Sequence, residues 1–280
     1  MFKSICKGLL ICFFSIVLIY MSGYGRIVEY SFYNILPYID SEGKNNWVEL
    51  GYIVGHASGG INGVSYTNSV EALLHTIDEG INVIEVDFNY TNDKELVCYH
   101  TLSDVYYQLS ENISLTDFMS LKVQGCYTPM TLNDVISIMK ANPNIYIAVD
   151  TKYNDLIEMV QDICNKCKDK DILNRFIIQL YYPNQKEKVQ EIYDFPNMLF
   201  APYKYSENPF DTLEVCYREN INVVVVNYKL WTSEIFKLFK SKGIFIYTYT
   251  VNRKDIADKL FKDGVYGIYT DFLLDYNSKY

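Results

Sequence analysis

The stretch Val83-Ile84-Glu85-Val86-Asp87-Phe88-Asn89 alternates between apolar and polar side chains over most of its length. Successive side chains of a β-strand point to opposite faces, so Glu85 and Asp87 share one face. The other face is apolar, which predicts that the strand is buried. Two carboxylates on one face of a buried strand repel each other and lose hydration, unless a cation lies between them. We therefore predict a strand that holds a metal ion, and oxygen ligands favour a hard one.

Short apolar runs that indicate strands recur along the chain. Eight are predicted, at residues 52–55, 83–88, 145–150, 176–180, 198–201, 223–226, 244–249 and 267–270. Helical patterns lie between most of them, and this order of strand and helix predicts a closed parallel (β/α)8 barrel, the TIM barrel. An open doubly wound sheet is the alternative, but no glycine-rich phosphate-binding fingerprint follows the first strand.

Helix boundaries and one interruption can also be predicted. A helix is expected over residues 68–79, with Asn68 and Glu71 as a capping box, and another begins at Thr131. Residues 90–100 interrupt the alternation of strand and helix. They contain a turn-like segment and then a strand-like one, so we expect an excursion after the second strand that folds back over the barrel mouth.

The composition is that of a folded, acidic protein. The 280 residues are 49% hydrophobic, which is enough for a full core, and the formal net charge is −9. The first 26 residues contain three basic residues and no acidic one, so the remainder is more acidic still. A surface that binds nucleic acid should be basic, and this balance therefore argues against nucleic acid as a partner.

The first 26 residues are expected to be a signal-anchor helix or a signal peptide. Lys3 and Lys7 precede an apolar run at residues 9–21, which is short for a membrane span of about 20 residues but fits a signal sequence. The basic residues place the N-terminus in the cytoplasm and the domain outside it. Residues 27–46 are then a connector, and residues 47–280 are a barrel domain that is membrane-anchored or, after cleavage, secreted.

Candidate catalytic residues follow the strands at the end where TIM-barrel loops carry chemistry. His56 follows the first strand, and His100 ends the excursion after the second. Asp150 and Lys152 share a face at the end of the third strand, beside the acidic pair of the second. Three carboxylates around a metal, with two histidines, suit phosphoryl chemistry. The metal neutralises phosphate oxygens, one histidine removes a proton, and the other donates one to the leaving oxygen.

Each residue also has a simpler interpretation. A single histidine at a strand end is usually a polar residue whose hydrogen bonds are satisfied within the fold. Asn68 alone could be an ordinary helix N-cap, and the role of Lys152 could be simply to pair with Asp150. His75 lies among charged residues of a helix and is expected on the solvated surface. These interpretations do not predict that so many ionisable groups gather at one rim, which favours a functional site.

Seven short motifs lie along residues 52–272. They are His56-Ala57-Ser58, Thr67-Asn68-Ser69, Glu85-Val86-Asp87, His100-Thr101, Asp150-Thr151-Lys152, Tyr249-Thr250-Val251-Asn252 and Thr270-Asp271. In order and spacing they resemble the motifs of the glycerophosphodiester phosphodiesterase family, which is part of the phospholipase-C-like TIM-barrel phosphodiesterases.

The resemblance implies a role for each matching residue. The implied acid–base pair is His56 and His100, and the implied ligands of Mg or Ca are Glu85, Asp87 and Asp150. The implied contacts to phosphate or substrate are Lys152 and Tyr249, and the implied supporting residues are Asn68 and Asn252. In the family, a neighbouring hydroxyl of the glycerol can attack phosphorus to give a cyclic phosphate, which water then opens.

Departures from the family's motifs bear on the substrate. Ala57 stands where the family has an arginine, so a bidentate contact to phosphate is missing. Gly59 and Gly60 let the backbone come close to a ligand, and their amides are expected to take over part of that contact. Three further replacements are Thr67 for a glutamate, Thr101 for an aspartate and Asp150 for a glutamate. The less crowded loop leaves room for a larger, lipid-linked or glycan-linked diester.

Three functions are compatible with the sequence. The leading one is a metal-dependent phosphodiesterase that hydrolyses a glycerophosphodiester or a related lipid or glycan phosphodiester. The acidic set also resembles the sphingomyelinase-D-like phospholipases of the same superfamily, which would give a cyclic phosphate. The third is a catalytically inactive barrel that binds a phospho-ligand, but the presence of both histidines and all three carboxylates argues against it.

Overall fold

The computed structural model describes residues 33, 36–40, 44–101, 113–153 and 155–276. The predicted N-terminal anchor, residues 1–26, lies outside them, and no helix within the described ranges is long and apolar enough to cross a membrane. The chain divides into two units, and Ile39–Tyr280 contains the whole barrel. The last part of the predicted connector belongs to this unit, because the backbone amide of Ile39 donates to Lys242 O at 2.8 Å.

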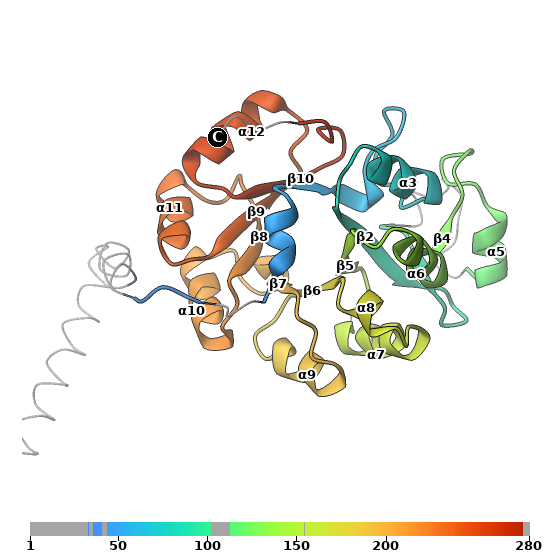
Figure 1. The fold of residues 1–280 in the computed structure, drawn as a ribbon, viewed down its shortest axis with the longest axis horizontal. Coiled ribbons are helices and arrows are strands. Elements are labelled where there is room, and N and C mark those ends of the chain that lie inside the picture. The colour runs from blue at the N-terminus through green and yellow to red at the C-terminus, as the bar shows by residue number, and fades with distance from the viewer. Residues whose placement is uncertain (1–32, 34–35, 41–43, 102–112, 154, 277–280) are drawn as a thin grey trace, which may run out of the picture. The chain divides into compact units, whose positions relative to one another are not determined.

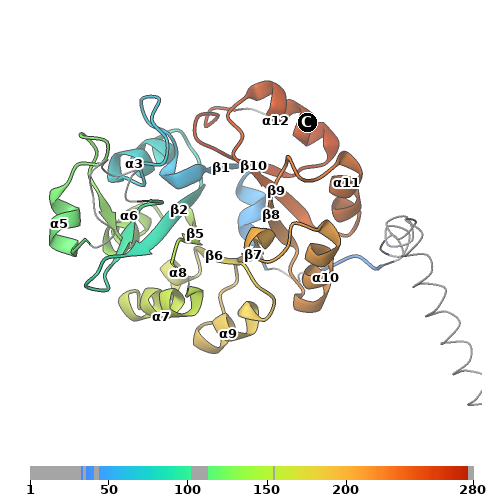
Figure 2. The ribbon, with the colours of Figure 1, turned by 180° about the vertical axis from the view of Figure 1, so that it is seen from behind.

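Eight parallel strands form a closed barrel, which Figures 1 and 2 show from its two ends. They are β1 (Ile53–Gly55), β2 (Val83–Tyr90), β5 (Tyr146–Thr151), β6 (Phe176–Leu180), β7 (Met198–Phe200), β8 (Val223–Asn227), β9 (Phe245–Tyr249) and β10 (Gly267–Thr270). Each strand pairs with the next in this order, and β1 pairs with both β2 and β10, which closes the ring. The predicted (β/α)8 fold is confirmed.

Helices surround the strands, as expected where both faces of a parallel sheet must be covered. They are α3 (Val70–Asp78), α6 (Leu132–Ala141), α7 (Leu156–Lys166), α8 (Lys170–Leu173), α9 (Gln185–Ile192), α10 (Pro209–Glu219), α11 (Ser233–Ser241) and α12 (Lys254–Asp263). The predicted start of α6 is confirmed, because Thr131 and Asp134 form a capping box there. Leu132, Val135 and Met139 form the buried stripe of this helix.

The predicted capping box of the first helix is wrong. Helix α3 begins at Val70, and Ser69 is its N-cap, with the hydroxyl accepting from the backbone amide of Ala72. Asn68 is instead bonded to Asp87 on β2. Glu71 bonds Thr128, accepting from its amide at 2.7 Å and from its hydroxyl at 2.8 Å. Asn68 and Glu71, which the local sequence pattern predicts as a capping box, therefore make tertiary contacts instead.

The predicted excursion after β2 is present and has its own small core. Strand β3 (Leu96–Cys98) pairs antiparallel with β2, β4 (Met130–Thr131) pairs with β3, and α5 (Leu115–Ser120) lies between them in the chain. Its buried residues include Val97, Tyr99, Phe118, Val123 and Tyr127. The excursion brings His100, just after β3, towards the barrel mouth.

The opposite end of the barrel is filled by aromatic side chains. The short helix η1 (Asn46–Leu50) precedes β1, so it lies at the N-terminal ends of the strands. Trp47 of this helix is fully buried against Tyr247, with ring centroids 5.0 Å apart. The Tyr247 hydroxyl donates to Gly51 O at 3.0 Å. This packing leaves the C-terminal mouth as the accessible end.

Candidate active site

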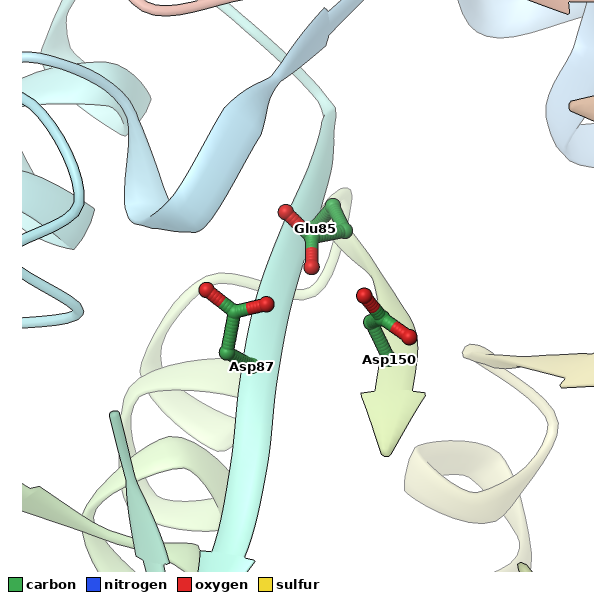
Figure 3. Close-up of side chains that lie close together, drawn as sticks. All are labelled: Glu85, Asp87 and Asp150. Atoms are coloured by element: carbon green, nitrogen blue, oxygen red, sulfur yellow. The ribbon is translucent and has the colours of Figure 1, made fainter. Parts of the chain in front are cut away.

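Three buried carboxylates meet on two neighbouring strands (Figure 3). Glu85 and Asp87 lie two residues apart on β2, and the strand register pairs Asp87 with Asp150 of β5. One oxygen from each of the three lies within 4.8 Å of the others. The residues are 2%, 1% and 8% exposed, so the structure brings together the three residues that the sequence predicts as metal ligands.

Hydrogen bonds hold the carboxylates in place but leave one carboxylate oxygen of Glu85 without a donor. Glu85 Oε2 accepts from the backbone amide of Ala57 at 2.7 Å, but Glu85 Oε1 is buried and has no hydrogen-bond partner among the described residues. Asp150 Oδ1 accepts from Gln179 Nε2 at 2.9 Å and from the Tyr181 hydroxyl. A buried carboxylate oxygen without a donor is costly, and a cation is the partner that would satisfy it.

Lys152 is the ammonium group nearest to this cluster. Its Nζ atom lies 2.9 Å from Asp87 Oδ1 and also contacts Asp150 Oδ2, so the predicted simple pairing with Asp150 is present. Burial opposes the charged lysine, but attraction from Asp87, Asp150 and Glu85 outweighs it and raises the pKa of Lys152. When all three carboxylates are ionised, one ammonium leaves two negative charges, which matches a divalent cation.

The carboxylates differ in their environment. Burial, together with repulsion from Asp87 and Asp150, raises the pKa of Glu85 well above its ordinary value. Burial acts on Asp87 in the same direction, but Lys152, His56 and Asn68 outweigh it and lower the pKa of Asp87. Lys152 and the amide of Ala57 do not outweigh these effects at Glu85, and the donor set of three oxygens fits a hard ion such as Mg or Ca.

His56, which follows β1, is held in place by an acidic residue that follows the last strand, β10. Its Nδ1 atom lies 2.8 Å from Asp271 Oδ1, and its side chain is 12% exposed. Asp271 follows β10, which is adjacent to β1. A carboxylate accepts hydrogen bonds, so Nδ1 carries the proton and Nε2 is left as the acceptor. Asp271 is absent from the predicted site residues, although the Thr270-Asp271 motif was the signal for it.

Asn252, predicted as a supporting residue, holds Asp271. Its Nδ2 atom donates to Asp271 Oδ2 at 2.6 Å, and its Oδ1 atom accepts from the Asp271 amide at 2.8 Å and from the Thr270 hydroxyl at 3.0 Å. Asn68, the other predicted supporting residue, makes the same kind of two-point contact with Asp87. Each asparagine therefore orients a carboxylate of the site.

Tyr66 lies between the two histidines and is not among the predicted site residues. Its ring centroid is 4.8 Å from that of His56 and 5.1 Å from that of His100, both edge-on. Its backbone has a φ of 59°, which is unusual for a bulky residue. Tyr66 lies in an irregular loop without periodicity, so no sequence pattern marks it.

One pocket of about 260 Å³ contains the predicted catalytic and substrate residues. His56, His100, Glu85, Asp150 and Lys152 line it, and Asp87 contacts Lys152 at 2.9 Å. Its walls are rich in tyrosine, namely Tyr66, Tyr203, Tyr249 and Tyr269. His75 is not part of the pocket, and its side chain is 40% exposed, as predicted.

The prediction that the amides of Gly59 and Gly60 contact a ligand is wrong. Gly59 N donates to His56 O and Gly60 N donates to Asp271 O, each at 2.7 Å. A Cβ atom at Gly60 would lie 2.3 Å from the Phe272 ring. The glycines therefore allow close packing of the loop after β1 against the chain after β10, and their amides are occupied.

The barrel and the site at its mouth place the chain among the TIM-barrel enzymes. Residues 60–274 match the sequence profile of the glycerophosphoryl diester phosphodiesterase family. This range is more than half of the chain, so the chain belongs to that family, and it is a phosphoric diester hydrolase. A search of curated protein sequences gave no match.

Solved structures have the same fold. A glycerophosphodiester phosphodiesterase from Parabacteroides distasonis aligns with a TM-score of 0.63 and 18% identity, over 79% of this chain and 92% of that one. One from Thermotoga maritima gives 0.62 and 19%, over 80% and 95%. A phosphodiesterase from Oleispira antarctica, in complex with the product sn-glycerol-3-phosphate, gives 0.61 and 13%, over 81% and 96%. At such identities the likeness is one of fold.

Proposed function

We propose that the protein hydrolyses a glycerophosphodiester, or a related lipid- or glycan-linked phosphodiester, with Mg or Ca as cofactor. His56 and His100 are the acid–base pair. The observation that carries this proposal is the single pocket that both histidines share with Glu85 and Asp150. The buried, unpartnered Glu85 oxygen supports a cation at this place.

Glu85, Asp87 and Asp150 would hold the cation. When bound, a divalent ion neutralises charge that develops on the phosphate oxygens. The Lys152 ammonium, 2.9 Å from Asp87 and in the wall of the pocket, adds positive charge near those oxygens. Asn68 keeps Asp87 in place, since it bonds both the carboxylate and the backbone amide.

The histidines transfer the protons. With Nδ1 bound to Asp271, His56 presents Nε2 to take or give a proton. His100 lies on the other side of Tyr66. Two separated histidines suit a reaction in which one takes the proton of the attacking hydroxyl and the other protonates the leaving oxygen.

The size of the pocket limits what part of a substrate enters it. Pockets for drug-sized ligands measure about 300–1,000 Å³, and this one is smaller, at about 260 Å³. It suits a phosphate with a small polyol such as glycerol. The rest of a lipid- or glycan-linked diester would extend out of the mouth past Tyr203, which is 42% exposed, and Tyr249.

We also propose that residues 1–26 are a signal-anchor or signal peptide that places residues 47–280 outside the cytoplasm. Lys3, Lys7 and the apolar run at residues 9–21 support this placement. Membrane fractionation followed by protease treatment of intact cells tests it. A barrel protected from protease in intact cells would contradict it.

Phosphorus NMR of candidate diesters incubated with the protein and Mg or Ca tests the proposed reaction. We expect a phosphomonoester product, and any cyclic phosphate would be seen directly. His56→Asn and His100→Asn should each lower turnover by about 100-fold or more. His75→Asn is the matched control and should leave turnover unchanged, because His75 is on the surface. Near wild-type turnover in His56→Asn would contradict the mechanism.

A further inference from the structure

Tyr269 is a buried tyrosine whose hydroxyl has no partner. It lies on β10 and lines the pocket together with Glu85 and Asp150, and the residue is 3% exposed. Among the described residues, its hydroxyl oxygen neither donates nor accepts a hydrogen bond. Buried polar groups are nearly always hydrogen-bonded, so an exception at a functional pocket points to a missing ligand.

Other buried tyrosines of the barrel differ in this respect. The Tyr181 hydroxyl donates to Asp150, and the Tyr247 hydroxyl donates to Gly51 O at 3.0 Å. Both of these hydroxyls therefore have a structural role. Since phenylalanine would fill the same volume at position 269 without an unsatisfied polar atom, the fold gains nothing from the Tyr269 hydroxyl.

The groups around the position of the missing arginine are already used. The arginine expected after His56 is replaced by Ala57, whose amide is used by Glu85. The amides of Gly59 and Gly60 donate to backbone carbonyls. Lys152 is already paired with two carboxylates. None of these groups replaces the missing arginine, whereas a tyrosine hydroxyl, which carries its proton at neutral pH, can donate a hydrogen bond to a phosphate oxygen.

We propose that the Tyr269 hydroxyl donates a hydrogen bond to a non-bridging oxygen of the bound phosphate and so takes over part of the contact that an arginine would make. This inference rests on the proposed function for the identity of the site. Tyr269 is then a substrate-contacting residue in the floor of the pocket. Its contact grows stronger as charge develops on the oxygen during the reaction.

Tyr269→Phe tests this, with Tyr247→Phe as the matched control. For Tyr269→Phe we expect an unchanged or higher melting temperature, because only an unsatisfied oxygen is removed. Its calorimetric Kd for inorganic phosphate, measured with Mg present, should rise about 10-fold, and kcat/KM should fall by about 10- to 100-fold. Its affinity for Mg should not change. Tyr247→Phe should lower the melting temperature and leave phosphate binding and turnover as in the wild type.

Three results would overturn the inference. They are equal phosphate affinity in Tyr269→Phe and the wild type, a loss of Mg affinity as large as that of phosphate affinity, and no phosphate binding by the wild type. If the wild type cleaves none of the diesters, the proposed function fails. The comparison of phosphate binding then still decides the role of Tyr269, so the two failures are distinguishable.

Discussion

Asn68 binds Asp87 at two points: its Nδ2 atom donates to Asp87 Oδ2 at 2.8 Å, and its Oδ1 atom accepts from the Asp87 backbone amide at 3.0 Å. Both residues are buried. Asp87 Oδ2 is therefore occupied, and Oδ1 faces Lys152 and the other carboxylates. Asn68, which the sequence pattern predicts as a helix cap, thus orients the proposed metal ligand Asp87.

Asn68→Ala should weaken Mg or Ca binding by about 10- to 100-fold, the usual effect of removing a group that orients a metal ligand. Titration calorimetry measures this directly. Asn92→Ala, in the exposed turn between β2 and β3, is the control and should bind metal normally. Unaltered affinity in Asn68→Ala would contradict the role of this contact.

Asp271→Asn should lower kcat by about 100-fold or more. Asp271 accepts from His56 with one oxygen and from Asn252 with the other, whereas an asparagine must turn its NH2 group towards one of these donors. Steady-state kinetics across pH tests this, and Asp275→Asn, at an exposed position nearby, is the control. A kcat close to that of the wild type would show that His56 does not depend on Asp271.

Tyr66→Ala should lower kcat by about 10-fold or more with a smaller change in KM, because both histidines lose the ring that packs against them. Tyr66→Phe keeps the ring and loses only the hydroxyl, so it should stay near the wild type. Equal losses in the two variants would indicate that the hydroxyl, and not the ring, matters.

Lys152→Met should destabilise the metal-free protein by about 1–3 kcal/mol, since two buried carboxylates lose their counter-charge. Added Mg should then raise the melting temperature more than in the wild type, because it replaces the missing charge. Thermal melts with and without Mg measure both effects. A smaller rise in the variant than in the wild type would argue against a cation at this place.

The barrel could be predicted because each strand and helix has a local signal. The alternation from Val83 to Asn89 marks β2, and the predicted strands end within two residues of the observed ones. The excursion after β2 gave a weaker signal. Its helix α5 and strand β4 are short, and their core forms from residues far apart in the chain, such as Val97 and Tyr127.

The site could be predicted where motif and strand end coincide, as for Glu85, Asp87 and Asp150. Contacts across the barrel could not. Asn68 and Ser69 are both good helix caps, and only the position of Asp87 decides that Ser69 caps α3. The occupied amides of Gly59 and Gly60 depend on packing against the chain after β10, which no local pattern contains.

Metal binding by the isosteric variant Asp87→Asn tests the central claim most directly, when phosphorus NMR of diester hydrolysis accompanies the calorimetry. Wild-type protein should bind one Mg or Ca, lose turnover in a chelator and regain it when the metal is restored. Asp87→Asn should lose both the calorimetric site and turnover. Unchanged metal binding in Asp87→Asn, or full turnover by the chelated wild type, would contradict a metal-dependent phosphodiesterase at Glu85, Asp87 and Asp150.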